Sequence, residues 1–270
     1  MANNPVTTLH EWNLAPDGHP GREAPRPPLV TTLHAWNLAP DEAKALQRTL
    51  AQRVVREDRV GKVERVAGVD MAINVENGMA RAAVVLLSFP GLELLEQHIY
   101  EEPVRMPYIP GLLSFREIPA ILGAFSLLKK RPDLVMVDGQ GIAHPRRLGI
   151  ASHLGLWLQL PTIGCAKSIL RGTYDRAALG DQVGDWVPLV DKSHHNEVLG
   201  AALRTRARVN PMFISLGYGI TLETSIHYVL ACSRGYRLPE PTRLADKLSK
   251  DNAWREPEAE SEAKQESLWE

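Results

Sequence analysis

Short apolar runs alternate with longer amphipathic stretches along the middle of the chain. The short runs predict β-strands over residues 64–70, 80–88, 92–101, 134–137 and 162–165. The amphipathic stretches predict helices over residues 41–56, 115–130 and 146–158. Three strands followed by an alternation of helices and strands predict an α/β fold, in which a mixed β-sheet is flanked by helices.

A segment near the N-terminus occurs twice. Residues 6–16 recur as residues 30–40 with a single difference, Glu11 in place of Ala35. The first copy is followed by a stretch rich in proline and glycine, whereas the second runs into the first predicted helix. The resulting domain boundaries are a disordered extension over residues 1–29, one folded domain over residues 30–250 and a disordered acidic tail over residues 251–270.

The formal net charge of −1 conceals an uneven distribution. Residues 251–270 carry seven acids and two bases, and residues 1–29 carry three acids and two bases, which leaves +5 on residues 30–250. A basic body permits a nucleic-acid partner. No apolar run is long enough for a membrane helix, no signal peptide is recognisable, and the two cysteines are too few for a disulfide framework. We therefore expect a cytoplasmic monomer without a membrane partner.

Two aspartates each end a predicted strand. Asp70 follows an apolar run, and Asp138 follows another. Carboxylates at the ends of neighbouring strands converge, and Mg²⁺ prefers such oxygen ligands. Aspartates at strand ends also simply begin turns, so both interpretations stay open on the pattern alone.

The segment between the third predicted strand and the next helix combines a stiff loop with a helix start. Ser114 and Glu117 have the spacing of a capping box, which predicts Ser114 as the N-cap residue. Before them, prolines at 107 and 110 bracket Tyr108, so this loop can present an aromatic wedge of the kind that base-flipping proteins insert into a base stack. The alternative is that Tyr108 covers the core.

The segment that follows Asp138 suits close approach to a phosphate. Gly139 allows a backbone to lie near a ligand, and Arg146 can bind phosphate oxygens. The segment lacks the Gly-Lys-Ser/Thr ending of a P-loop, and His144 has no cysteine partner at zinc spacing.

Together these segments resemble the endonuclease V family of deoxyinosine-directed repair nucleases. The matching blocks are VAGVD at 66–70, PYIPGLLSFRE at 107–117, VDGQGIAHPRRLGIASH at 137–153, PTIGCAKS at 161–168 and YRLPEPTR at 236–243. They occur in the family's order over roughly residues 33–246. The resemblance implies a ribonuclease H-like fold, which agrees with the predicted order of elements.

The resemblance also implies roles for individual residues. The implied catalytic residues are Asp70, Glu117, Asp138 and Lys167, of which the three acids would bind Mg²⁺, with Mn²⁺ as a substitute. The implied wedge and strand contacts are Tyr108, Pro110, His144 and Arg146. The implied pocket for flipped hypoxanthine is formed around Gly111, Leu113, Gly139 and Ile150.

One position departs from the family pattern. After Asn210 and Pro211 we expect a Gly-His pair near the metal, but the chain has Gly217-Tyr218. A tyrosine hydroxyl, with a pKa of about 10, is a poor base near neutral pH.

The activity that the resemblance implies is cleavage of the second phosphodiester bond 3′ to deoxyinosine in DNA, leaving 3′-hydroxyl and 5′-phosphate ends. The alternatives are an endoribonuclease specific for inosine that uses the same site, and an impaired inosine-DNA binding module.

Overall fold

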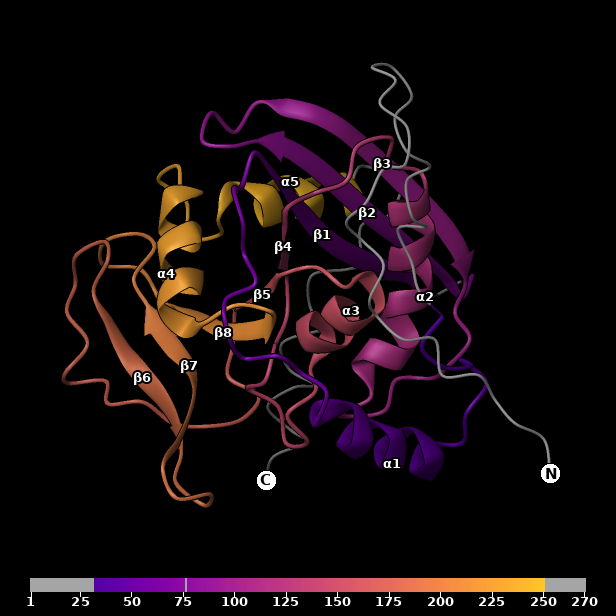
Figure 1. The fold of residues 1–270 in the computed structure, drawn as a ribbon, viewed down its shortest axis with the longest axis horizontal. Helices are drawn as coiled ribbons and strands as arrows, with labels where there is room; N and C mark the ends of the chain where they lie inside the picture. Colours follow the sequence, from indigo (N-terminus) through magenta and orange to yellow (C-terminus); the bar gives the residue numbers. More distant parts are fainter. Residues whose placement is uncertain (1–31, 76, 251–270) are drawn as a thin grey trace, which may run out of the picture.

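The computed structural model describes residues 32–75 and 77–250, and an eight-stranded sheet runs through this part of the chain (Figure 1). The strands are β1 (Arg65–Asn74), β2 (Met79–Ser88), β3 (Leu94–Pro103), β4 (Leu134–Val137), β5 (Thr162–Ala166), β6 (Trp186–Asp191), β7 (Glu197–Leu203) and β8 (Met212–Tyr218). The helices are α1 (Pro40–Ala51), α2 (Leu113–Ser126), α3 (Ile150–Leu158), α4 (Leu222–Ala231) and α5 (Glu240–Ser249).

The strand order is β3-β2-β1-β4-β5-β8-β7-β6, with β1, β4 and β5 parallel at the centre and antiparallel pairs on both sides. The register of the central pair decides where Asp70 and Asp138 lie. Val69 on β1 pairs with Val137 on β4, so Asp70 and Asp138 each follow a paired residue at the same edge of the sheet. The predicted mixed sheet is therefore confirmed.

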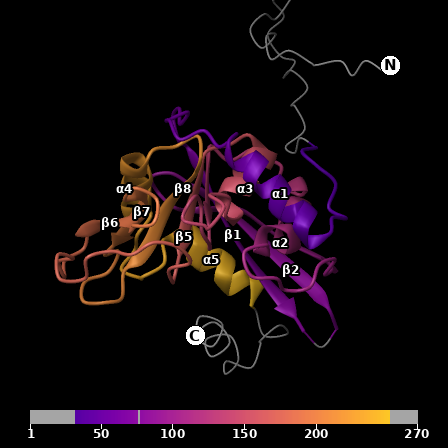
Figure 2. The ribbon, with the colours of Figure 1, turned by 90° about the horizontal axis from the view of Figure 1, so that it is seen from below.

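Helices cover both faces of the central strands. On one face, Ile118 of α2 and Leu154 of α3 pack with Val69 in one apolar cluster. On the other face, α5 lies against β1 and β2, where Ala245 packs with Val85 (Figure 2). Because the sheet is buried on both sides, its central strands are nearly continuous apolar runs.

The predicted strands and helices are all present, with shifted ends. The prediction that Asp70 ends its strand is wrong, because β1 stays paired with β2 as far as Asn74 and only the pairing of β1 with β4 stops at Val69. Helix α1 ends five residues earlier than predicted, and α3 begins four residues later. The late start of α3 follows from Arg147, whose φ of 57° interrupts a right-handed helix. The predictions for residues 1–29 and 251–270 lie outside the described residues. Among the described residues, no helix is both long and apolar enough to cross a membrane.

The predicted capping box at the start of α2 is wrong. Leu112 is the N-cap residue and forms no side-chain cap hydrogen bond. Ser114 lies within the first turn and is buried, with its Oγ 3.0 Å from Nδ1 of His153 on α3. The serine hydroxyl thus interacts with α3 instead of capping α2. The carboxyl group of Glu117 faces the pocket described below.

Candidate active site

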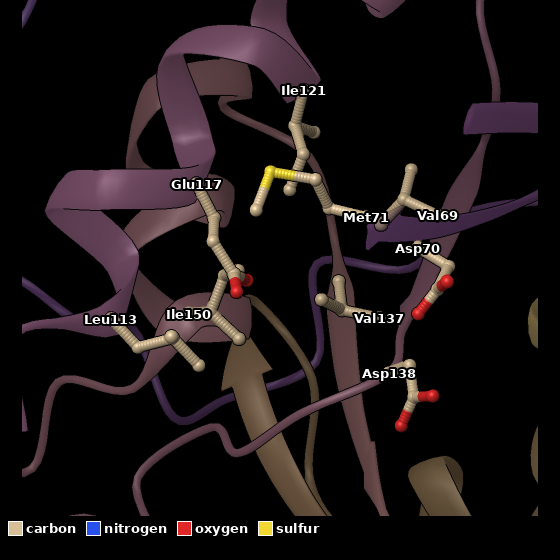
Figure 3. A pocket seen from close by; sticks show the side chains of 9 residues that line it. All are labelled: Val69, Asp70, Met71, Leu113, Glu117, Ile121, Val137, Asp138 and Ile150. Atoms are coloured by element: carbon tan, nitrogen blue, oxygen red, sulfur yellow. The ribbon is translucent and has the colours of Figure 1, made fainter. Parts of the chain in front are cut away.

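Three carboxylates from distant parts of the chain meet at one edge of the sheet. Asp70 comes from β1, Asp138 follows β4, and Asp246 lies on α5; one oxygen of each lies within 4.8 Å of the others. Glu117 enters the adjoining pocket from α2, and Figure 3 shows its carboxyl group in the pocket that Asp70 and Asp138 also line. The structure therefore brings together the three acids that the sequence indicates and adds a fourth.

The position of Asp246 depends on a close contact between α5 and β1. Gly68 lies under the start of α5, where a Cβ atom would come within 2.0 Å of the Pro241 carbonyl oxygen. Asp246 is five residues beyond Pro241, about 7.5 Å along the helix, and Asp70 is two residues beyond Gly68, about 6.8 Å along the strand. The bare glycine thus lets the helix carry Asp246 to Asp70.

The acids perturb one another because they are close and poorly solvated. Burial, together with the nearby charge of Asp138, raises the pKa of Asp70 to about 7. Burial and the charges of Asp70 and Asp138 raise the pKa of Glu117 to about 8. Ser249 at the end of α5 donates a hydrogen bond to Oδ2 of Asp70, which opposes this shift. The site concentrates negative charge that its surroundings only partly compensate.

Two lysines supply the compensation. Lys167 Nζ lies 2.7 Å from Oδ2 of Asp138 and 2.9 Å from Oδ1 of Asp246, and Lys250 Nζ lies 2.9 Å from the same Asp246 oxygen. Although burial lowers it, the pKa of Lys167 rises above its usual value because both carboxylates favour the ammonium form. Lys167, which the sequence indicates as a site residue, therefore contacts two of the clustered carboxylates.

The donor set fits a hard divalent cation. All three clustered groups offer carboxylate oxygens, which suit Mg²⁺ and Mn²⁺ rather than a softer metal. The raised pKa values of Asp70 and Glu117 also fit a cation site. They show that the negative charges at this site repel one another, and a bound cation would relieve that repulsion and favour the charged forms.

A larger cavity of 280 Å³ adjoins the acids and shares Leu113, Asp138 and Ile150 with the pocket in Figure 3. Gly111 and Gly139 also line it, so all four residues expected around a flipped base border one cavity. Lys167 and Tyr108 reach the same space. Gln140 lines the cavity too, and its Oε1 is a buried oxygen without a hydrogen-bond partner in the structure.

Hydrogen bonds from three side chains fix the loop that carries Gly111. The Gly111 carbonyl oxygen accepts hydrogen bonds from Gln47 Nε2 (3.0 Å), His144 Nε2 (3.1 Å) and Arg146 Nη2 (2.7 Å). His144 is buried, and burial together with the charge of Arg146 lowers its pKa to about 3. His144 and Arg146 therefore support the cavity wall as neutral and charged donors, and their contact with a bound strand stays a prediction.

The predicted wedge lies at the outer edge of this cavity. Tyr108 is 53% exposed, and Pro110 beside it is exposed as well. Covering the core, the alternative for Tyr108, is therefore wrong. Its insertion into a base stack stays a prediction.

The expectation that Tyr218 lies beside the metal site is wrong. Tyr218 pairs with Thr162, the first residue of β5, whereas the acids lie beyond the opposite ends of the neighbouring strands. The Tyr218 side chain is buried, and its hydroxyl donates to Oε1 of Gln159 at 3.0 Å. The hypothesis of an impaired binding module depended on that placement and loses its basis.

Comparison with known proteins agrees with this geometry. The family model for endonuclease V matches residues 48–247. The chain belongs to the endonuclease V family. Endonuclease V of Nostoc sp. is 51% identical over 209 residues, which are 77% of this chain and 92% of that protein. Endonuclease V of Gloeobacter violaceus is 51% identical over 253 residues, 92% of each chain.

Solved structures of endonuclease V share the fold. The crystal structure of the Streptomyces avermitilis endonuclease V matches with a TM-score of 0.75 at 37% identity, covering 86% of this chain and 96% of that one. Endonuclease V of Ciona intestinalis, in complex with a 24mer DNA containing an inosine followed by a ribo-adenosine, matches with a TM-score of 0.68 at 30% identity, covering 78% and 95%. The expected ribonuclease H-like fold is thereby confirmed.

Asp246 is the site residue that the sequence reasoning missed in this endonuclease V chain. A signal was available, since Asp246 comes three residues after the family block at 236–243. Its helix has an apolar face that packs on the sheet, which is the condition for carrying a polar residue to the sheet edge.

Proposed function

We propose that this protein is a metal-dependent endonuclease that recognises deoxyinosine in DNA and cleaves the second phosphodiester bond 3′ to it. The observation that carries the proposal is the shared wall between the acidic cluster and the cavity, formed by Leu113, Asp138 and Ile150. A base bound in the cavity would therefore place the phosphates of its own strand next to the acidic cluster. The inosine-containing DNA bound by the Ciona relative supports this substrate.

The cavity suits a flipped hypoxanthine. The glycines at 111 and 139 let main-chain groups approach the base edge, because no side chain stands in between. The unpartnered Oε1 of Gln140 offers an acceptor for a base N–H group. Tyr108 fills the gap that the flipped base leaves in the duplex, and flipping costs least for a weakly paired base.

Asp70, Asp138 and Asp246 are the residues that hold the divalent ion, Mg²⁺ with Mn²⁺ as a substitute. A bound ion supplies positive charge that acidifies water and neutralises charge on the phosphate in the transition state. Lys167 places its ammonium group at the same edge and adds positive charge toward the phosphate oxygens. In the reaction a water oxygen bonds to phosphorus, and the bond to the 3′ oxygen breaks.

Glu117 handles the proton of the attacking water. Its carboxyl group faces the pocket that Asp70 and Asp138 also line, and a bound cation favours its charged form, which is the form that accepts a proton. The proton taken from the water is passed on to the 3′ oxygen, which leaves as a hydroxyl, and the phosphate stays on the 5′ end.

A nicking assay tests the proposal. The purified full chain is incubated with duplex DNA that contains a single deoxyinosine, in Mg²⁺, in Mn²⁺ and in EDTA, with undamaged duplex as the control. The expected result is one nick, mapped by length to the second bond 3′ of the lesion, in either metal and none in EDTA. Binding of inosine DNA without any nick in either metal would overturn the enzyme assignment.

Inosine in RNA is a second candidate substrate. The Ciona relative was crystallised with DNA in which a ribo-adenosine follows the inosine, so a 2′-hydroxyl next to the lesion fits that protein. Matched DNA and RNA strands with one inosine each, compared by kcat/KM, decide between the two. Faster cleavage of the RNA strand would assign the protein as an inosine endoribonuclease.

A further inference from the structure

Three aromatic side chains of α2 and α3 are covered by a segment of the chain itself. We call the surface that they form under this segment the aromatic groove (Phe115, His153 and Trp157). Trp36 stacks on Trp157 with ring centroids 4.9 Å apart and an interplanar angle of 15°. His34 Nε2 lies 2.8 Å from Nε2 of His153, and the His34 ring meets Trp157 edge-on. The occupying segment belongs to residues 30–40, the second copy of the repeated sequence.

The exposure of this segment alternates along its length. Leu33, His34, Trp36 and Leu38 are partly buried. Ala35 and Asn37, which lie between them, are exposed. Inward-facing side chains therefore fall at the positions that contact the groove and the adjoining core.

The first copy preserves every inward-facing residue. Residues 6–16 contain the counterparts of the histidine, the tryptophan and both leucines, and their one difference, Glu11, falls at the exposed position of Ala35. A glutamate at a position that faces solvent does not interfere with packing. The chain thus carries two segments with the side chains that fit one groove.

We propose that residues 6–16 are a second, interchangeable occupant of the aromatic groove within the same chain. Residues 32–39 of the second copy are the usual occupant, because they run directly into α1. Residues 6–16 can replace them only by closing a loop over the intervening residues, which has an entropic cost. The first copy therefore fills the groove when the second is released.

Occupancy of the groove matters to the molecule because the groove supports α2. His153 lies 3.0 Å from Ser114 in the first turn of α2, and the same helix carries Glu117 one turn later. A filled groove keeps this histidine between two partners, His34 and Ser114. The inference concerns the scaffold and does not depend on which substrate the site cleaves.

A double-mutant cycle in the full chain tests the proposal. The variants are Trp12→Ala, Trp36→Ala and both together, measured by denaturant unfolding. The expected result is that Trp36→Ala lowers the folding equilibrium constant about tenfold more when Trp12 is also replaced, the size of coupling between residues that serve one site. Equal effects of Trp36→Ala in both backgrounds would overturn the proposal. Asn13→Ala and Asn37→Ala, at the exposed position of each copy, form the control cycle and should show no coupling.

Fluorine NMR supplies a readout that does not depend on the double variant folding. The full chain is labelled with 5-fluorotryptophan, and the Trp12 resonance is assigned from its loss in Trp12→Ala. In Trp36→Ala the Trp12 resonance should move and broaden as its ring packs against Trp157. An unchanged Trp12 resonance would overturn the proposal, and a change that grows with protein concentration would overturn it in favour of exchange between molecules.

Discussion

Single side chains decide the charge balance of the site. Asp246 is the acid that both lysines contact, at 2.9 Å from each ammonium group. Those contacts lower its pKa against the opposing effect of burial, while the pKa of Asp70, which faces no lysine at hydrogen-bond distance among the described residues, rises to about 7. Asp246 is therefore the member of the cluster that stays ionised most readily.

Asp246→Asn should weaken metal binding without unfolding the protein. It removes one charged oxygen ligand from the cluster, so the Mg²⁺ concentration for half-maximal nicking should rise by at least about tenfold. A metal titration of the nicking rate measures this. Asp41→Asn, on the exposed start of α1, is the matched control and should behave like the wild type. An unchanged Mg²⁺ requirement would remove Asp246 from the metal site.

Tyr218→Phe should affect stability and leave the chemistry alone. The substitution removes the hydrogen bond to Gln159, which costs about 1 kcal/mol of unfolding free energy. Because Tyr218 lies at the far end of β5, kcat for inosine DNA should stay at the wild-type value. A tenfold change in kcat for Tyr218→Phe, or a gain in turnover for Tyr218→His, would contradict this placement.

At the scale of elements, the contact between α5 and β1 assembles the site. Gly68 lets the start of α5 lie directly on the strand, and the end of the same helix supplies Asp246 and Ser249 to Asp70. The loop between β3 and α2 has the complementary task of presenting Tyr108, and its anchor is the Gly111 carbonyl with its bonded donors.

Gly68→Ala should displace α5 and disable the site. A Cβ atom 2.0 Å from the Pro241 carbonyl oxygen forces the helix away, at a cost of about 1–3 kcal/mol. Nicking should fall together with the stabilisation that added Mg²⁺ confers, which thermal unfolding with and without metal measures. Gly61→Ala is the control, because its Cβ would meet nothing within 4 Å. Retained wild-type nicking in Gly68→Ala would contradict this account of α5.

Tyr108→Ala should reduce lesion discrimination while the fold stays intact. The side chain is 53% exposed, so its loss removes little core packing. If the ring replaces a flipped base in the stack, the ratio of kcat/KM for inosine over undamaged DNA should drop about tenfold, the size of one aromatic–base stack. The unfolding midpoint serves as the check on folding. An unchanged ratio would exclude the wedge role.

At the scale of the whole molecule, titration of the site makes stability depend on pH. Asp70 and Glu117 have folded-state pKa values of about 7 and 8, above those of unfolded carboxyl groups. Each therefore contributes stability that is fully present below its unfolded pKa and is lost as the pH rises through its folded value. His34 and His153, whose pKa values are lowered by burial, act in the opposite sense and cost stability as the pH falls below about 6.5.

Glu117→Gln should stabilise the metal-free protein at alkaline pH. In EDTA at pH 9 the wild-type carboxylate is charged among other acids, whereas glutamine is neutral, so the variant should gain at least ~1 kcal/mol, the free energy of one pKa unit. At pH 4 both side chains are uncharged and the difference should vanish. Chemical denaturation at the two pH values measures it, and the histidines cancel because both proteins contain them. A difference independent of pH would contradict the raised pKa.

Local pattern in the sequence was sufficient for most of the fold and part of the site. Apolar runs and amphipathic periods depend on near neighbours, so they located the first five strands and the first three helices, with Asp138 directly after β4 and Asp70 inside β1. Periodicity in the last hundred residues was not assigned to elements, and β6, β7, β8, α4 and α5 emerged only in the structure.

Contacts between distant segments decided the rest. The sequence by itself determined the family and the mixed sheet, because short-range patterns and family motifs depend on near neighbours, and the family resemblance implied that Asp70 and Asp138 act together. Only the tertiary structure decided that Asp246 joins them, that Ser114 serves α3 instead of capping α2, and that Tyr218 lies at the other end of the sheet. Each of those outcomes depends on which helix packs against which strand, and helix packing is set by shape across the whole core.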